Sequence, residues 1–192
     1  MRARLLLASS SPRRRDLLAQ IGIIPDGILS PDIDETPKRD ELPRAYVMRL
    51  AQAKALAAAS SINAGGLLLA ADTSVALGRR ILPKAEDEAT ARRCLGLLSG
   101  RRHTVMTAVV LRAADGSQTS RLVESVVGLS RFTDDQIDAL ISAGDWQGKA
   151  GGYAVQGHAA AFVRFLSGSY SNVVGLPLFE TAQLLRGRGW MP

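Results

Sequence analysis

The sequence predicts an α/β fold, and three features of the chain support this prediction. Residues 67–71 are five consecutive apolar residues after a pair of glycines, as expected for a strand that is buried on both faces. Residues 4–21 have the pattern of a strand, a serine-rich turn and a helix. Residues 103–129 have the pattern of two long strands joined by a hairpin turn at Asp115-Gly116.

The first strand is predicted at residues 4–9, and a helix follows it. Ser11 suits the N-cap position of this helix, and Pro12 suits its first helical position. Gly22 ends the helix, and its apolar stripe consists of Leu17, Leu18 and Ile21.

Three arginines, Arg13 to Arg15, occupy the first turn of that helix. Positive side chains there oppose the helix dipole, at a cost of roughly a few tenths of a kcal/mol each. A bound phosphate would remove this conflict, and Ser9 to Ser11 would add hydroxyl and backbone donors. We therefore favour an anion site at this turn over the alternative, a solvated basic start of a helix.

Residues 29–42 are polar and contain two prolines, which predicts a loop. Its acids Asp32, Asp34 and Glu35 offer the hard oxygen ligands that Mg²⁺ and Mn²⁺ prefer. The alternative is that this acidic loop is only solvated.

The next helix is predicted from about Pro43 to Ala58, with Val47, Leu50 and Ala51 on its inner face. Lys54 lies four residues beyond Leu50 on that same face. A charge there must either reach solvent or meet a counter-charge. We expect Lys54 to face a cleft.

The apolar run at 67–71 leads directly to Asp72 and Thr73, and the strand then continues to Leu77. An acid at the carboxyl end of a buried strand lies where open α/β sheets build their sites. Asp72 is therefore the first candidate for chemistry. The alternative is that Asp72 caps the turn that follows.

Residues 148–157 contain four glycines, which either let the backbone approach a ligand or simply make turns. Lys149 and Gln156 are the polar side chains of this segment. The single cysteine, Cys94, is expected to fill the core. The other expected elements are an extended segment at 81–84, helices at 86–98, from Thr133 or Asp134 to Gly144 and at 177–185, and a strand at 159–166.

Composition narrows the classes of function. The chain carries a formal net charge of +6, but its basic residues are spread along its whole length without interleaved aromatic residues, so a nucleic-acid ligand is not expected. No run approaches the roughly 20 apolar residues of a membrane span. One cysteine excludes an internal disulfide and fits a reducing cytoplasm. The only lysines are Lys38, Lys54, Lys84 and Lys149, and they are expected to mark places that need a compact ammonium.

The polar candidates lie at loop mouths, helix starts and strand ends. Basic groups and free amides suit a polyphosphate, while carboxylates suit a divalent ion and a water-activating base, which predicts metal-assisted hydrolysis of a phosphoric anhydride. The chain contains neither a GxxxxGK[ST] loop nor GxGxxG after its first strand, and its histidines and cysteine match no zinc or serine-hydrolase pattern. The candidates are Ser9 to Arg13, Glu35, Lys54, Asp72, Thr73, Lys84, Lys149 and Gln156.

Seven segments together resemble the Maf proteins, a family of nucleoside triphosphate pyrophosphatases once described as septum-formation inhibitors. They occur in the order of the family and span nearly the whole chain. The matching segments are LLLASSSPRRRDLL (5–18), DETP (34–37), AQAKA (51–55), LLAADTSVALGRRILPK (68–84), LSGRRHTVMTAVVL (98–111), GKAGGYAVQG (148–157) and GSYSNVVGLPL (168–178).

The resemblance implies an enzyme that cleaves a nucleoside triphosphate between the α and β phosphates, giving the monophosphate and pyrophosphate, with Mg²⁺ or Mn²⁺. It implies a single domain over residues 1–192, with an elongated twisted mixed sheet flanked by helices and two lobes around a central cleft, as in Maf and ITPase-like proteins. It also implies a homodimer. The alternative, suggested by the older family description, is a nucleotide-binding regulator of cell division with little catalysis.

The resemblance also implies roles for single residues. Asp72, the aspartate of the ADT motif, is implied as the proton acceptor for the attacking water. Arg13, Thr73 and Gln156 match three positions that set substrate choice and mark the branch acting on dTTP and UTP, with a house-cleaning role that extends to modified pyrimidine nucleotides. Further matches are Ser10 and Lys149 for the phosphates, Lys54 and Lys84 for catalysis, and Glu35, with Asp72, for the metal.

The chain departs from the family pattern at two places. Pro83 precedes Lys84, where the usual order is lysine and then proline. Gly148 stands where relatives carry an acid before Lys149. If that acid holds the metal or the water in relatives, Asp145 or another group must serve here.

Overall fold

The computed structural model of the protein describes residues 3–190. Its main sheet has seven strands in the order β2-β1-β3-β6-β7-β9, with β4 also paired to β3. Strand β1 runs parallel to β2 and β3 and the other pairs are antiparallel, so the predicted mixed α/β class is confirmed. The strands of this sheet are β1 (Leu5–Ala8), β2 (Gly27–Leu29), β3 (Leu67–Leu77), β4 (Arg80–Leu82), β6 (Arg102–Ala113), β7 (Gln118–Leu129) and β9 (Val163–Ser167).

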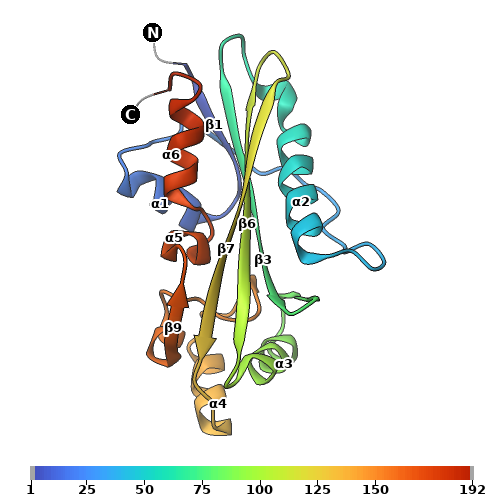
Figure 1. The fold of residues 1–192 in the computed structure, drawn as a ribbon, viewed down its shortest axis with the longest axis vertical. Helices are drawn as coiled ribbons and strands as arrows, with labels where there is room; N and C mark the ends of the chain where they lie inside the picture. Colours follow the sequence, from blue (N-terminus) through green and yellow to red (C-terminus); the bar gives the residue numbers. More distant parts are fainter. Residues whose placement is uncertain (1–2, 191–192) are drawn as a thin grey trace.

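Helices cover both faces of the sheet at one end and gather around its other end (Figure 1). Helices α1, α5 and α6 lie on one face, α2 lies on the opposite face, and α3 and α4 lie at the far end. The short strands β5 (Lys84–Ala85) and β8 (Lys149–Ala150) pair with each other. The helices are α1 (Pro12–Gln20), α2 (Pro43–Ala57), α3 (Glu88–Leu98), α4 (Asp134–Ser142), α5 (Tyr170–Val174) and α6 (Leu178–Arg186), with 3₁₀ turns at Ala59–Ser61 and His158–Phe162.

Three apolar clusters give the molecule its two lobes. One cluster lies between α1, α6 and one face of β1 and β3, and a second lies between α2 and the opposite face. The third joins α3 and α4 to the far ends of β3, β6 and β7, and Cys94 belongs to it, fully buried as predicted. The first two clusters build one lobe and the third builds the other.

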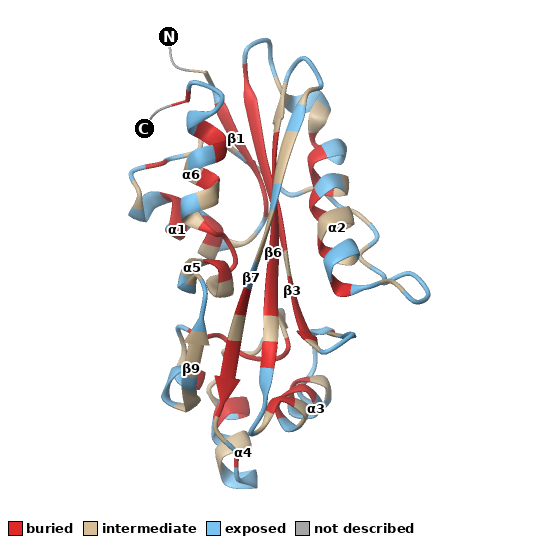
Figure 2. Ribbon diagram, in the orientation of Figure 1, coloured by how far each residue is buried: buried red, intermediate tan, exposed pale blue. Residues whose placement is uncertain are grey.

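Strand β3 runs through both lobes and is buried along most of its length (Figure 2). Leu67, Leu69 and Ala71 point into the cluster under α1 and α6. Leu68 and Ala70 point into the cluster under α2. Because helices cover both faces there, residues 67–71 of the strand are continuously apolar instead of alternating.

The edge of β3 that faces β1 has a gap in its pairing. Strand β1 pairs with Leu67–Ala70 and β4 pairs with Val75–Leu77, while β6 pairs along the opposite edge. Residues 71–74 are therefore covered by no strand of the described chain on this edge. Asp72 lies in this gap, inside β3 and not at its carboxyl end or in a turn, so the turn-capping alternative is wrong. Asp72 instead follows the point where the shorter neighbouring strand, β1, reaches its carboxyl end.

One other expectation about local structure is wrong in part. Residues 159–162, predicted as the start of a strand, lie in the 3₁₀ turn His158–Phe162, and the strand β9 begins only at Val163. Alanine, which fills most of this segment, has a low propensity for strands. The Asp145 carboxylate also accepts the His158 N–H at 2.7 Å, and this bond favours the turn. Ser11 occupies the N-cap position of α1 as predicted, but its side chain makes no capping bond.

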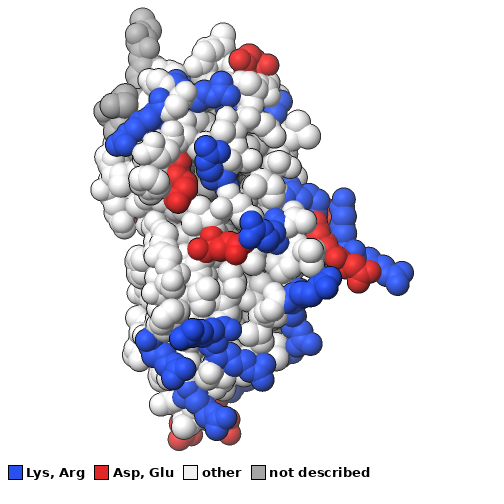
Figure 3. Space-filling view, viewed as in Figure 1, with Lys and Arg blue, Asp and Glu red and all other residues white. Residues whose placement is uncertain are grey.

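No helix within residues 3–190 is long and apolar enough to cross a membrane. Lys and Arg side chains are spread over both ends of the face shown in Figure 3, with a gathering over the end that carries β9 and α4. The positive charge that is spread along the sequence is thus also widely spread in space.

Candidate active site

A cavity of about 460 Å³ lies at the gap in the edge of β3. Five cationic side chains and two carboxylates line it, a formal excess of three positive charges that suits a polyphosphate. The nine residues that the family resemblance assigns to the site all line this one cavity. These residues are Ser10, Arg13, Glu35, Lys54, Asp72, Thr73, Lys84, Lys149 and Gln156.

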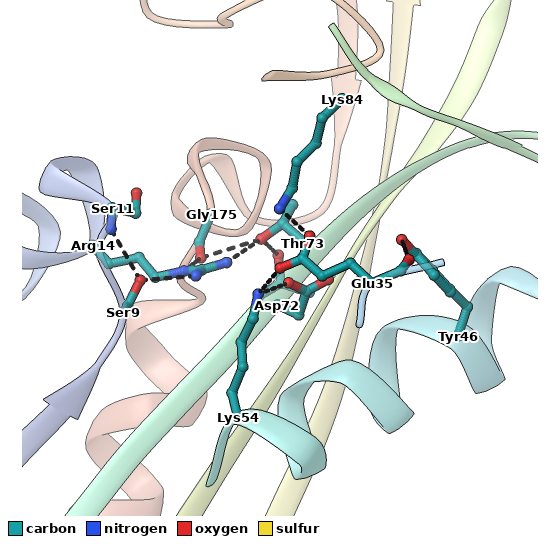
Figure 4. Close-up of polar contacts among 11 residues, drawn as sticks. Ser9, Ser11, Arg14, Glu35, Tyr46, Lys54, Asp72, Thr73, Lys84 and Gly175 are labelled. Carbon is teal, nitrogen blue, oxygen red and sulfur yellow. Dashed lines mark hydrogen bonds and ion pairs between the residues drawn. The ribbon is translucent and has the colours of Figure 1, made fainter. Parts of the chain in front are cut away.

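Lys54 joins the two carboxylates of the cavity (Figure 4). From α2, its ammonium contacts Asp72 Oδ1 at 2.5 Å and Glu35 Oε1 at 2.7 Å. Asp72 is 2% exposed and Lys54 is 8% exposed, so their attraction offsets much of the cost of burying two charges. The expectation that Lys54 faces a cleft is confirmed, and of the two ways to accommodate its charge the structure shows a counter-charge.

Glu35 reaches the cavity from the loop before α2 and bridges two lysines. One carboxylate oxygen contacts Lys54, and the other contacts Lys84 on β5. Tyr46 O–H donates to the backbone carbonyl of Glu35 at 2.9 Å and so fixes the loop to α2. Burial by itself would raise the pKa of Glu35, but the two lysines outweigh burial, and the pKa lies below its usual 4.5.

The two carboxylates fit a hard divalent cation if other ligands complete its coordination. No group of three or more His, Cys, Asp and Glu side chains converges within the described part of the chain. Glu35 and Asp72 already converge on one cation, the Lys54 ammonium, so they can share one Mg²⁺ or Mn²⁺, with substrate phosphate oxygens as further ligands. Asp32 and Asp34, the other candidate ligands of this loop, are exposed and do not line the cavity.

Arg14, which the sequence did not single out, is a buried cation of the same cavity. Its Nε donates to the Gly175 carbonyl at 2.8 Å, Nη1 donates to Ser9 Oγ at 3.0 Å, and Nη2 donates to Thr73 Oγ1 at 3.1 Å (Figure 4). It forms no ion pair with any residue of the described chain, and burial lowers its pKa. A buried guanidinium without a carboxylate partner is the arrangement expected of an anion site.

Arg13 and Lys149 add two further cations. Burial, and next the charge of Arg14, lowers the pKa of Arg13. Burial, and next the charge of Arg13, lowers the pKa of Lys149, whose ammonium donates to the Gln147 carbonyl at 2.9 Å. These cations repel one another, and a bound anion would relieve the repulsion.

Another part of the cavity wall is apolar and suits a nucleobase. Tyr153 belongs to it, and the Tyr153 hydroxyl lies 2.7 Å from Nε2 of the buried His103. Burial lowers the pKa of His103 to about 4, so this imidazole is neutral and serves as a fixed support. Gln156 lies in the same glycine-rich segment as Tyr153 and also lines the cavity. The apolar lining residues are Val75, Val105, Ala154, Val155, Val173 and Val174.

Asp145 does not replace the acid that the family pattern has before Lys149. Its carboxylate is bound to His158, at 2.7 Å from both the backbone N and Nδ1, and it does not line the cavity. The position of the missing acid, Gly148, has a φ of 64° and donates its N–H to the Ala85 carbonyl. Such a left-handed turn favours glycine over an acidic residue.

The phase of helix α1 could have identified Arg14. Leu17 and Leu18 are buried, and Arg14 precedes them by three and four residues, on the same face of the helix. Thr107 and Gly175 were also missed. Thr107 lies opposite Thr73 across the β3–β6 ladder, a proximity that only the sheet register reveals.

Comparison with known proteins identifies relatives over nearly the whole chain. The model of the family described as "Maf-like protein" matches residues 4–188. A protein of Gluconobacter oxydans named dTTP/UTP pyrophosphatase is 62% identical over 191 residues, covering 97% of this chain and 88% of that protein. A protein of Caulobacter vibrioides with the same name is 56% identical over 188 residues, covering 98% of this chain and 97% of that protein.

Solved structures also show partial similarity. The Ham1 protein of Staphylococcus aureus superposes with a TM-score of 0.46 and 18% sequence identity. The match covers 66% of this chain and 71% of the Ham1 chain.

Proposed function

The chain belongs to the Maf family, and on that premise we propose that it is a pyrophosphatase that hydrolyses dTTP and UTP to the nucleoside monophosphate and pyrophosphate. Relatives that carry this activity in their names are 54–62% identical over nearly the full chain. The cavity offers what the reaction needs: cations for the phosphates, an apolar wall for the base and a carboxylate for the water.

In the proposed reaction, water attacks the α-phosphorus and Asp72 accepts its proton. The bond from the α-phosphorus to the bridging oxygen breaks, and the pyrophosphate leaves with that oxygen. The observation that carries this assignment is the position of Asp72, a buried carboxylate at the uncovered edge of β3 in a cavity with five cations. A paired strand holds the carboxylate rigidly, as a general base requires.

The cations bind the triphosphate and offset the charge that develops on the leaving pyrophosphate. Lys54 and Lys84 also hold Glu35 in place beside Asp72. Arg14 and Lys149 supply further positive charge from α1 and from the glycine-rich segment. A Mg²⁺ or Mn²⁺ ion held by Glu35 and Asp72 would polarise the phosphate and lower the pKa of bound water.

Substrate choice is assigned to the residues that face the base and the α-phosphate. Gln156 reads the edge of the pyrimidine, because its amide can donate to one ring group and accept from the next, as uracil and thymine present them. Arg13 and Ser10 bind phosphate oxygens at the start of α1. The hydroxyl of Thr73 is engaged by Arg14, so Thr73 acts on the substrate through that arginine.

A hydrolysis screen tests the proposed function. Common nucleoside triphosphates and 7-methyl-GTP are incubated with Mg²⁺ or Mn²⁺ in ¹⁸O-labelled water, and the products are separated by chromatography. The expected result is fastest turnover of dTTP and UTP, with pyrophosphate as product and the label in the monophosphate. Release of a diphosphate and inorganic phosphate, or fastest turnover of 7-methyl-GTP, would contradict the proposal.

No observation on the described residues favours the alternative of a division regulator with little catalysis. The predicted homodimer, the cytoplasmic location and the absence of a nucleic-acid ligand stay predictions. Light scattering of the purified protein checks the dimer.

A further inference from the structure

Two threonine hydroxyls connect Arg14 on α1 to α5, which lies on the same face of the sheet (Figure 1). Thr73 on β3 and Thr107 on β6 lie directly opposite each other, with their Oγ1 atoms 3.0 Å apart. Thr73 Oγ1 also accepts from Arg14 Nη2, and Thr107 Oγ1 donates to the Asn172 carbonyl at 3.1 Å. Thr107 is fully buried.

The direction of these hydrogen bonds follows from the groups at their ends. A carbonyl only accepts, so the single proton of Thr107 points to Asn172. Thr107 must then accept from Thr73, which leaves the oxygen of Thr73 to accept from Arg14. The Gly175 carbonyl is a second acceptor within reach of the Thr73 hydroxyl, but at 3.3 Å it is farther away than Thr107 Oγ1 at 3.0 Å. The bonds thus run one way from Arg14 to Asn172, and such chains strengthen each bond.

The Asn172 carbonyl needs Thr107 because α5 is only five residues long. The N–H of Leu176, four residues on, bonds to Ser171 and not to Asn172. The Asn172 side chain also donates to the Val105 carbonyl and to Ser125 Oγ, which fixes α5 to β6 and β7. The residues that follow Asn172, from Val173 to Gly175, line the cavity.

Arg14 has five N–H groups, and three of them are used by Gly175, Ser9 and Thr73. The remaining two N–H groups of this guanidinium fork are on Nη1 and Nη2, one on each, and can donate to phosphate oxygens. The orientation of this fork depends on Thr73, and the orientation of Thr73 depends on Thr107.

We propose that Thr107 is a positioning residue for the nucleotide: through Thr73 it aims the Arg14 guanidinium at the phosphates and holds α5 against the base. This inference rests on the proposed function, because it concerns the same cavity. It explains how Thr73 sets substrate choice although its hydroxyl is already used inside the protein. Thr107 does not itself line the cavity.

The test compares three variants by steady-state kinetics with dTTP and by thermal unfolding. Thr107→Val keeps the shape but breaks the chain of bonds, and Thr107→Ser keeps the hydroxyl. Thr181→Val is the matched control, because Thr181 is also fully buried and donates to a carbonyl, that of Pro177 at 2.7 Å, but this bond reaches no residue that lines the cavity. The expected result is a KM raised about tenfold in Thr107→Val with kcat nearly unchanged, and near-normal KM in the other two.

A double-mutant cycle adds a readout that a purely structural role would not move. In an Arg14→Gln background, Thr107→Val should raise KM by much less than in the wild-type background, because the guanidinium is gone and only the hold of Thr107 on α5 is left to lose. If Thr107→Val does not fold, Thr73→Val takes its place in the same cycle. A wild-type KM in Thr107→Val, an equal defect in Thr107→Ser, or full additivity with Arg14→Gln would overturn the inference. Failure of the wild-type enzyme to hydrolyse dTTP would instead refute the proposed function.

Discussion

Replacing Lys54 and Lys84 in turn by methionine should separate a buried ion pair from an exposed one. Both lysines contact Glu35, and methionine keeps most of the side-chain volume while it removes the charge. Lys54→Met leaves the buried carboxylate of Asp72 without an ion-pair partner among residues 3–190, whereas Lys84→Met leaves Glu35 still paired with Lys54. The two variants should therefore differ greatly in stability.

The burial of each pair sets the expected magnitude. The Lys54 and Asp72 side chains are 10% and 3% exposed, and loss of one partner from such a pair costs about 3–5 kcal/mol. The Lys84 side chain is 41% exposed, so solvent screening limits its ion pair to about 1 kcal/mol or less. For a chain of this length, 1 kcal/mol corresponds to roughly 2–4 °C in Tm. The expected falls are thus on the order of 10 °C for Lys54→Met and about 4 °C or less for Lys84→Met.

Thermal unfolding followed by circular dichroism, with urea unfolding as a second measure, gives both values. Activity should fall in both variants, so turnover does not distinguish the two ion pairs. The difference in Tm between the variants does. A Tm for Lys54→Met within about 2 °C of wild type, or equal losses in the two variants, would refute the reasoning from burial.

Three further outcomes are expected. Arg14→Lys keeps the charge but loses the three-way fork, so kcat/KM should fall roughly 10–100-fold, while the exposed control Arg15→Lys stays near wild type; equal effects would contradict the anion site. The pKa of Glu35 is lowered in the fold, so its charge stabilises the protein above about pH 4.5 and this contribution is lost as the pH falls through the lowered value. Urea titrations should therefore show a shallower loss of stability below pH 4.5 in Glu35→Gln than in wild type, and parallel curves would count against the bridge. Gln156→Leu should bring the kcat/KM ratio of dTTP to dCTP close to one without loss of fold, and an unchanged ratio would remove Gln156 from base recognition.

The sequence predicted most of the elements because local signals decide them. The hairpin at Asp115-Gly116 forms between β6 and β7, with Gly116 at a φ of 84°. Thr133 caps α4 with the full capping box that its spacing from Gln136 allows. The helix predicted from residue 86 begins at Glu88, with Asp87 as its cap. The strand predicted at 159–166 is confirmed only from Val163 on. Its first half forms a turn because Asp145 binds His158, and Asp145 lies outside the sequence window that periodicity covers.

The residues of the candidate site could be predicted from the sequence, but the hydrogen bonds between them could not. The family motifs predict that Asp72, Lys54 and Glu35 belong to one site, and the structure places all three in one cavity. The pairing of Thr73 with Thr107 depends on strand register, which is a tertiary property. The helix phase set by Leu17 and Leu18 indicates that Arg14 turns inward, but its partners Gly175 and Thr73 are brought beside it only by the tertiary structure.

The central claim is that Asp72 takes the proton from the attacking water. Asp72→Asn is the most direct measurement, because asparagine has the same shape and Lys54 keeps Glu35 as a partner, so the fold should persist. Turnover of dTTP should fall roughly 1,000-fold while calorimetric binding of a non-hydrolysable dTTP analogue changes only a few-fold. Turnover within tenfold of wild type in a folded Asp72→Asn protein would contradict the claim.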